Sequence, residues 1–93
     1  MVIFKRILDL QRHLQKVRDA RKKIGFVPTM GALHEGHLSL IRRSLQENDC
    51  TVCSIFVNPT QFNDTKDFEK YPVTIENDIY LLEKANTEIL FLP

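Results

Sequence analysis

Residues 52–57 of the chain are apolar at five of six positions. A strand with one face in water alternates apolar and polar residues, whereas an almost unbroken apolar run is typical of a strand buried on both faces of a parallel sheet. Parallel strands are joined by crossover segments, which are usually helices. The run therefore predicts an α/β fold in which helices cover both faces of a sheet.

The rest of the sequence contains the helices and strands that such a fold requires. Ile7, Leu10, Leu14 and Val17 recur at helical spacing, as do apolar residues in two later segments. The expected strands cover residues 2–4, 24–28, 52–57 and 88–92, and the expected helices cover residues 6–20, 36–48 and 75–85, the last with Thr74 as its N-cap. This order predicts right-handed crossovers and the first half of a doubly wound, Rossmann-like parallel sheet.

Composition and charge narrow the function classes. The chain has 93 residues, 43% hydrophobic and 27% charged, which is ordinary for one small globular domain. No apolar run approaches the roughly 18 residues of a membrane span and the first residues lack the apolar core of a signal peptide, so we expect a cytoplasmic protein without a membrane partner. Residues 1–23 are basic, but these charges surround the apolar stripe of a helix without interleaved aromatic residues, and we expect no nucleic-acid partner.

Cys50 and Cys53 form a C-x-x-C pattern, the chain's only cysteines. Two cysteines cannot build a four-cysteine zinc site, and the pair falls on a predicted strand rather than at the helix start used by redox pairs. Because residues i and i+3 of a strand point to opposite faces, a disulfide between them is not expected. The prediction is two buried, reduced thiols.

The turn at residues 28–37 joins a predicted strand to a predicted helix. A helix N-terminus presents free N–H groups and a partial positive charge, and it therefore attracts anions. Gly31 and Gly36 allow a ligand to approach the backbone, while His34 and His37 lie on one face of the first helical turn. A zinc protease would need H-E-x-x-H instead of the H-E-G-H found here. The pattern predicts a phosphate site of backbone amides and two imidazoles.

Within this site we expect His37 to be the catalytic residue, since its protonated form neutralises phosphate charge and donates toward a leaving oxygen. His34 would steady the nucleotide, and Glu35 would cap the helix or point to solvent. The loop at residues 58–62 also follows a strand end, so that it should meet the turn at one crevice. There, Gln61 can bind a hydroxyl and a carboxylate of a small acid, beside apolar contacts from Phe62 and Met30.

Three ordered segments resemble the pantoate–β-alanine ligases, also called pantothenate synthetases. They read P-T-M-G-A-L-H-E-G-H-L-S-L at residues 28–40, S-I-F-V-N-P-T-Q-F at residues 54–62 and D-F-E-K-Y-P-V-T at residues 67–74. The H-x-G-H element alone is shared with cytidylyltransferases, adenylyltransferases and class I aminoacyl-tRNA synthetases, so it indicates only the nucleotidyltransferase type of fold. The second and third segments narrow the resemblance to the ligases. Two local departures are Asn63-Asp64-Thr65 in place of a Gly- and Pro-containing turn, and Val73 where Arg is usual.

The resemblance implies an ATP-dependent condensation of pantoate with β-alanine through a pantoyl adenylate, with release of AMP and pyrophosphate. Mg²⁺ would accompany ATP, with no protein-bound metal, and the complete enzyme would be a homodimer. By analogy, His37 would be the proton donor and Gln61 would bind pantoate and β-alanine. The implied ATP-binding residues are Met30, Gly31, Ala32, Leu33, His34, Glu35, Gly36 and His37. Additional substrate contacts would come from Pro28, Thr29, Met30, Asn58 and Phe62.

Members of this family are much longer, so the resemblance implies that residues 1–93 are a single partial nucleotide-binding domain. It would lack a later Lys- and Ser-bearing loop and a closing C-terminal domain, and we expect little or no ligase activity from it alone. Two other function classes stay open. One is a non-catalytic nucleotide-binding α/β module, and the other is a nucleotidyltransferase acting on another small molecule, which would leave residues 58–62 unexplained.

The partial domain also predicts self-association. In the strand order typical of this fold, the strand at residues 24–28 pairs on both sides, and its partner from the second half is absent from this sequence. An exposed apolar edge favours pairing with another copy or exchange of an element. Light scattering at high concentration should therefore detect oligomers, and a monodisperse monomer would contradict this expectation.

Overall fold

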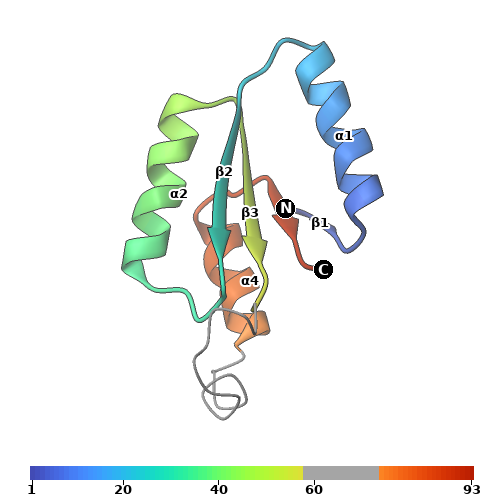
Figure 1. Cartoon of the computed structure of the whole chain (residues 1–93). Helices are drawn as coiled ribbons and strands as arrows, with labels where there is room; N and C mark the ends of the chain where they lie inside the picture. Colours follow the sequence, from blue (N-terminus) through green and yellow to red (C-terminus); the bar gives the residue numbers. More distant parts are fainter. Residues whose placement is uncertain (58–73) are drawn as a thin grey trace.

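The computed structural model describes residues 1–57 and 74–93, which form alternating strands and helices (Figure 1). In chain order the elements are β1 (Val2–Phe4), α1 (Ile7–Asp19), β2 (Ile24–Thr29), α2 (Glu35–Glu47), β3 (Cys50–Ile55), α4 (Ile75–Lys84) and β4 (Ile89–Phe91). Every expected element is present, with boundaries shifted by at most two residues. None of the helices described is long and apolar enough to cross a membrane.

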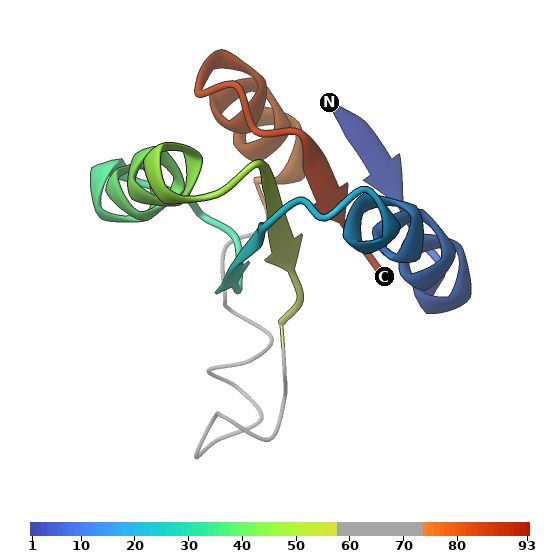
Figure 2. The ribbon, with the colours of Figure 1, turned by 90° about the horizontal axis from the view of Figure 1, so that it is seen from above.

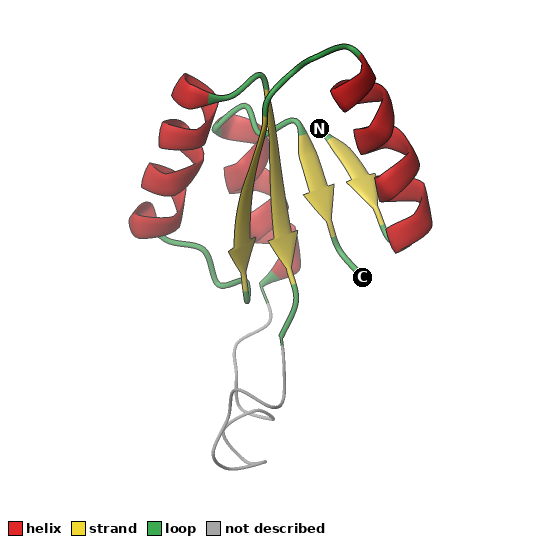
Figure 3. Ribbon diagram, turned by 45° about the horizontal axis from the view of Figure 1, so that its top comes forward, coloured by secondary structure: helices red, strands yellow, loops and turns green. Residues whose placement is uncertain are grey.

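The four strands form one parallel sheet in the order β1-β4-β3-β2. Their arrows all point the same way (Figure 3), so the carboxyl ends lie together at the lower edge of the sheet in Figure 1. Seen from above, α2 and α4 lie on one side of the sheet and α1 lies on the other (Figure 2). This arrangement confirms the predicted Rossmann-like sheet with flanking helices.

Strand β3 is buried along its whole length, as predicted for residues 52–55, whereas Phe56 of the predicted buried run lies beyond the strand and is 53% exposed. Cys53 packs in the cluster beneath α2 and α4, with Ile41 and Leu82, whereas Cys50 packs beneath α1 with Leu10. Both cysteines are free, which confirms the prediction of two buried thiols on opposite faces. Burial raises the pKa of the Cys53 thiol to about 11, so this thiol stays protonated at neutral pH.

The boundaries of β3 differ from the expected residues 52–57. The strand begins at Cys50 because the Cys50 N–H donates to the Lys23 carbonyl at 3.0 Å, which brings Cys50 into register with Ile24. It ends at Ile55, opposite the last residue of β2, Thr29. Pairing with the neighbouring strand therefore sets these limits, and the apolar run alone could not.

Ile7 differs from expectation, whereas Thr74 is the predicted N-cap but makes a different hydrogen bond. Ile7 was placed on the apolar stripe of α1, but it is 51% exposed because the helix contacts the core only from Leu10 onward. Thr74 stands at the N-cap of α4 without a side-chain hydrogen bond to the helix backbone. Its hydroxyl donates instead to the Asp78 carboxylate, 3.3 Å from each oxygen.

Among the strands described, β2 pairs with β3 alone and so forms an edge. The Phe56 N–H donates to the Thr29 carbonyl at 3.0 Å, which turns the backbone of Thr29 toward β3. The preceding residue, Pro28, therefore turns its nitrogen toward the free edge, where it has no hydrogen to donate. Phe26 is 61% exposed on the same strand, so this edge is apolar but lacks one ladder donor.

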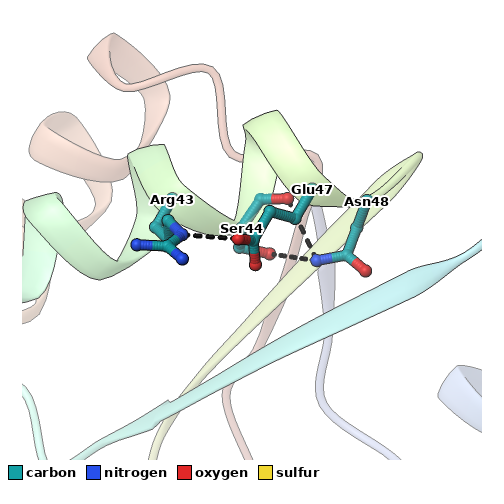
Figure 4. Close-up of polar contacts among 4 residues, drawn as sticks. All are labelled: Arg43, Ser44, Glu47 and Asn48. Carbon is teal, nitrogen blue, oxygen red and sulfur yellow. Dashed lines mark hydrogen bonds and ion pairs between the residues drawn. The ribbon is translucent and has the colours of Figure 1, made fainter.

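A close contact at Gly25 sets the height of α2 above the sheet. A Cβ at Gly25 would lie 2.0 Å from Ser44 Oγ and 2.5 Å from Asn48 Nδ2. Asn48 donates from Nδ2 to the Ser44 carbonyl at 3.1 Å (Figure 4), and the Ser44 and Thr51 hydroxyls share a buried hydrogen bond of 2.7 Å. The absence of a side chain at Gly25 thus allows α2 to sit directly on the sheet, which also places the N-terminus of the helix.

We predict that Gly25→Ala lowers the free energy of unfolding by about 1–3 kcal/mol, the usual cost of overpacking a filled core. The new Cβ would displace the Ser44 hydroxyl from Thr51. Urea denaturation followed by circular dichroism measures the change. Ser39→Ala, on the exposed side of α2, is the control and should change stability by less than about 0.5 kcal/mol. Equal stability of the two variants would contradict this packing.

Candidate functional site

The turn between β2 and α2 carries most of the predicted site residues, and its backbone takes an unusual course. Gly31 and Ala32 have φ values of +83° and +52°, a region that residues with side chains rarely adopt. A Cβ on Gly31 would lie 3.1 Å from both Asp78 Oδ2 and Ile55 Cγ2. Glycine therefore suits this position in conformation and in size, whereas Ala32 has to be held by its contacts.

Those contacts come from Asp78 on α4. The Ala32 N–H donates to Asp78 Oδ2 at 3.0 Å and the Leu33 N–H donates to Asp78 Oδ1 at 2.9 Å. The carboxylate is 1% exposed and also accepts the Thr74 hydroxyl. The first residues of the turn are thus tied to a helix that lies much later in the chain.

A second tie joins the turn to the sheet. The Gly31 N–H donates to the Thr29 hydroxyl at 3.2 Å, and that hydroxyl donates to the Ser54 carbonyl on β3 at 2.8 Å. Thr29 was predicted as a substrate contact, but its hydroxyl is engaged within the protein. Its position at the carboxyl end of β2 is as predicted.

The two imidazoles cap α2 together. His34 is the N-cap residue, and its Nδ1 accepts the Gly36 N–H at 3.0 Å. His37 Nδ1 accepts the His34 N–H at 3.1 Å, and the ring centroids lie 4.1 Å apart. Since a nitrogen that accepts a hydrogen bond carries no proton, each neutral ring has its hydrogen on Nε2. The cap therefore leaves two Nε2–H donors at the start of the helix.

The environment of His37 favours the neutral ring. Burial lowers the pKa of His37 below its ordinary value of 6.5, and the charge of His34 lowers it further, while Asp78 acts in the opposite sense. The sequence led us to expect a protonated His37 that neutralises phosphate charge. The structure instead favours a neutral ring that donates through Nε2–H.

The backbone amides of the turn are largely committed within the protein. Hydrogen bonds to side chains engage the N–H groups of five residues: Gly31, Ala32, Leu33, His34 and Gly36. We expected these amides to bind the anion directly. Five of them instead stabilise the turn by binding side chains of the protein. The partial positive charge at the N-terminus of α2 remains, as do the two Nε2–H groups.

A cleft of about 240 Å³ opens beside the turn, at the carboxyl ends of the strands. Met30, Gly31 and Ala32 line one side, and Phe56, Thr74 and Asp78 are among the residues that line the rest. The lining does not include His34 or His37. The structure thus brings the first part of the predicted ATP loop to a shared cleft, while the imidazoles lie outside the lining of this cleft.

The remaining predicted residues are either exposed at the surface or outside the described residues. Glu35 is exposed and pairs with Arg42, in keeping with the expectation that it caps the helix or points to solvent. Pro28 is exposed at the edge strand. Asn58, Gln61 and Phe62 lie outside the described residues, as do Asn63, Asp64, Thr65 and Val73.

Asp78 is the site residue that the sequence reasoning missed. An acidic residue in the first turn of a helix normally interacts with the helix dipole at the surface, as Glu76 in the same turn is expected to do. One available signal was its spacing of three residues from Ile75 and four from Leu82, which places it near the predicted apolar face of α4.

Metal ligands are not gathered at this site. The described residues contain no group of three or more His, Cys, Asp or Glu side chains arranged to hold a metal ion. His34 and His37 both turn Nδ1 to the backbone, which is the geometry of a helix cap.

A parallel sheet with a histidine-bearing turn between a strand and a helix defines a Rossmann-like fold of the nucleotidyltransferase type. The sequence profile described as "Pantoate-beta-alanine ligase" matches residues 2–93. The chain belongs to the pantoate–β-alanine ligase family.

Individual relatives agree with this assignment. The chain is 53% identical to pantothenate synthetase of Thermotoga petrophila over 93 residues, all of this chain and 33% of the relative. It is 45% identical to the pantoate–β-alanine ligase of Francisella tularensis complexed with β-γ ATP and β-alanine, with a TM-score of 0.86 over 100% of this chain and 35% of that one. Pantothenate synthetase of Thermus thermophilus gives 41% identity and a TM-score of 0.80, covering 100% of this chain and 32% of that one. The chain therefore spans about a third of the length of these relatives.

We predict that His37 titrates with a midpoint below 6.5 in the folded chain and carries its proton on Nε2 when neutral. Nitrogen–proton NMR of the imidazoles measures both properties, with the urea-unfolded chain as the reference. Because the folded pKa is the lower one, the unfolded state binds more protons, and this group's contribution to stability is lost as the pH falls below 6.5. A folded midpoint at or above the unfolded one, or a neutral ring protonated on Nδ1, would contradict the described cap.

Proposed function

We propose that the chain supplies the ATP-binding part of a pantoate–β-alanine ligase, which forms pantothenate for coenzyme A biosynthesis. One observation carries this proposal: two imidazoles, their Nδ1 atoms used in the helix cap, stand together at the N-terminus of α2, and neither Nε2–H has a hydrogen-bond partner among the described residues. Such a helix start favours phosphate. The Francisella relative, complexed with β-γ ATP and β-alanine, supports the same small-molecule substrates for this chain's complete protein.

The proposed reaction has two steps. A carboxylate oxygen of pantoate attacks the α-phosphorus of ATP, the bond to the bridging oxygen breaks, and pyrophosphate leaves with that electron pair. The amine of β-alanine then attacks the acyl carbon of pantoyl adenylate, forms the amide, loses a proton and displaces AMP. Adenylation is needed because a carboxylate has no good leaving group.

In the first step we assign His37, which the resemblance implies as the proton donor, as the hydrogen-bond donor to the leaving pyrophosphate, and His34 as a nucleotide-steadying residue. Charge develops on the pyrophosphate oxygens as the bond to phosphorus breaks, and an Nε2–H placed beforehand stabilises it without reorganisation. A neutral His37 fits this task, since it donates a hydrogen bond without having to remain charged at neutral pH. The committed amides of Gly31 to Leu33 hold the turn in the shape that presents the rings.

Pantoate would bind in the cleft at the carboxyl ends of β3 and β4. Met30 and Phe56 offer apolar surface for its hydrocarbon part. Gln61 stays the proposed polar contact for pantoate and β-alanine, with Asn58 and Phe62 beside it. Mg²⁺ would be held by the phosphates of ATP, and it would offset phosphate charge.

Several properties of the complete protein belong to the same proposal. They are the ligase activity itself, a cytoplasmic location and a homodimeric assembly. For residues 1–93 we propose a partial nucleotide-binding domain that binds ATP without completing the reaction. A non-catalytic nucleotide-binding module and a nucleotidyltransferase for another small molecule would share the ATP site, and they differ from a ligase in showing no affinity for pantoate.

His37→Asn tests the role of the Nε2–H directly. The carboxamide oxygen of Asn can replace Nδ1 as the acceptor for the His34 N–H, so the cap is retained while the Nε2–H is lost. We predict about tenfold weaker binding of MgATP by titration calorimetry, the scale of one hydrogen bond to a charged group. Pantoate binding, titrated separately, should be unchanged.

His13→Asn is the matched control, because His13 lies on α1, on the other side of the sheet. It should bind MgATP as tightly as the unsubstituted chain. Equal affinity of His37→Asn and His13→Asn, with both folded by circular dichroism, would refute the assignment of the imidazoles to the nucleotide.

A further inference from the structure

We propose that Asp78 is the positioning residue of the β2–α2 turn, holding the loop in the conformation that presents His34 and His37 to the nucleotide. The inference rests on the proposed function and adds a residue outside the histidine motif. Asp78 lies on α4, 46 and 45 residues away from the two amides that it binds. It touches the turn through its carboxylate and acts on the ligand only through the turn.

Asp78 is buried and its carboxylate is fully engaged in hydrogen bonds. A carboxylate is almost never fully buried unless its oxygens are paired, because leaving water is unfavourable for a charged group. Asp78 is 1% exposed, and both oxygens accept backbone N–H groups of the turn in addition to the Thr74 hydroxyl. Hydrogen bonds to an ionised acceptor are stronger than neutral ones. The Asp78 side chain is therefore held in one position by its hydrogen bonds to the turn and to Thr74.

The hydrogen-bond partners of Asp78 lie where the turn enters α2. Ala32 has a φ of +52°, which a residue with a side chain does not keep without outside support. Asp78 binds the N–H of Ala32 and of Leu33, the residue just before the His34 N-cap. These two bonds decide the direction in which the chain enters α2, and with it the direction of both rings.

The alternative is that Asp78 serves only to begin α4. An acidic residue in the first turn of a helix normally faces the free N–H groups of that same helix. The Asp78 oxygens reach across to a different element instead, and Gly31 has no side chain where a Cβ would lie 3.1 Å from one of them. The close approach of the turn to the carboxylate thus depends both on Gly31 in the turn and on Asp78 in α4.

Asp78→Asn in the 93-residue chain tests the proposal. The carboxamide keeps the shape but offers one acceptor oxygen, so that one of the two amides must face an NH₂ group. Expected results are faster hydrogen exchange at Ala32 and Leu33, displaced imidazole NMR signals of His34 and His37, and about tenfold weaker binding of MgATP. Ile89→Val is the control, since it removes a buried methylene from β4 in the separate cluster beneath α1, which contains no residue of the turn.

Gly31→Ala is a second route to the same effect and leaves Asp78 intact. The added Cβ would lie close to Asp78, and a residue with a side chain rarely adopts a φ of +83°. The substitution therefore disfavours the conformation in which the turn binds Asp78, and the variant should show the changes expected for Asp78→Asn. The double variant should be no worse than the more severe single one, because both remove the same contact. If Asp78→Asn fails to fold, the comparison of Gly31→Ala with Ile89→Val tests the proposal.

Unchanged exchange and unchanged imidazole signals in a folded Asp78→Asn chain would overturn the proposal. Equal changes in Ile89→Val would overturn it as well, since general destabilisation would then explain them. If the unsubstituted chain binds no MgATP, the proposed function fails, and the exchange rates and imidazole signals still decide whether Asp78 positions the turn.

Discussion

Two consecutive left-handed residues, Gly31 and Ala32, determine where α2 begins. The chain leaves the edge strand β2 and has to reverse toward a helix that packs on the same sheet, and the positive φ values make this possible within a few residues. Contacts from β3 and α4 hold the reversal in place. The cap of α2, the tautomers of its two histidines and the position of the cleft all follow from this short piece of backbone.

The resulting anion site differs from a loop whose backbone amides surround a phosphate. Here most of the amides in the turn bind side chains of the protein. Among the remaining donors are the Nε2–H groups of His34 and His37, whose orientation is set by the bonds at Nδ1. Backbone amides thus act indirectly, by fixing side chains, and the helix contributes its partial positive charge.

The fold could be read from the sequence because its main signals are local. The apolar run at residues 52–57 and the apolar spacing of Leu10, Leu14 and Val17 identify a buried strand and an amphipathic helix without any knowledge of their neighbours. The ends of β3 were misplaced because they depend on pairing with β2, which is a tertiary property. Ile7 was misassigned for a similar reason, since helical spacing cannot tell how far the sheet extends beneath α1.

The site was only partly predictable. The motif locates the histidines at a helix start, but it cannot show which ring nitrogen faces the backbone or that burial lowers the pKa of His37. Asp78 escaped notice because its partners lie 45 and 46 residues earlier in the chain, and such pairings exist only after folding.

The central claim is that ATP phosphates bind to the imidazole pair at the start of α2. Its most direct measurement is an NMR titration of the isotope-labelled chain with MgATP, observing the Nε2 signals of all three histidines. The account predicts saturable shifts at His34 and His37 with one common dissociation constant, and no shift at His13 on α1. Saturable shifts confined to His13, or no change at His34 and His37 in a folded chain, would contradict it.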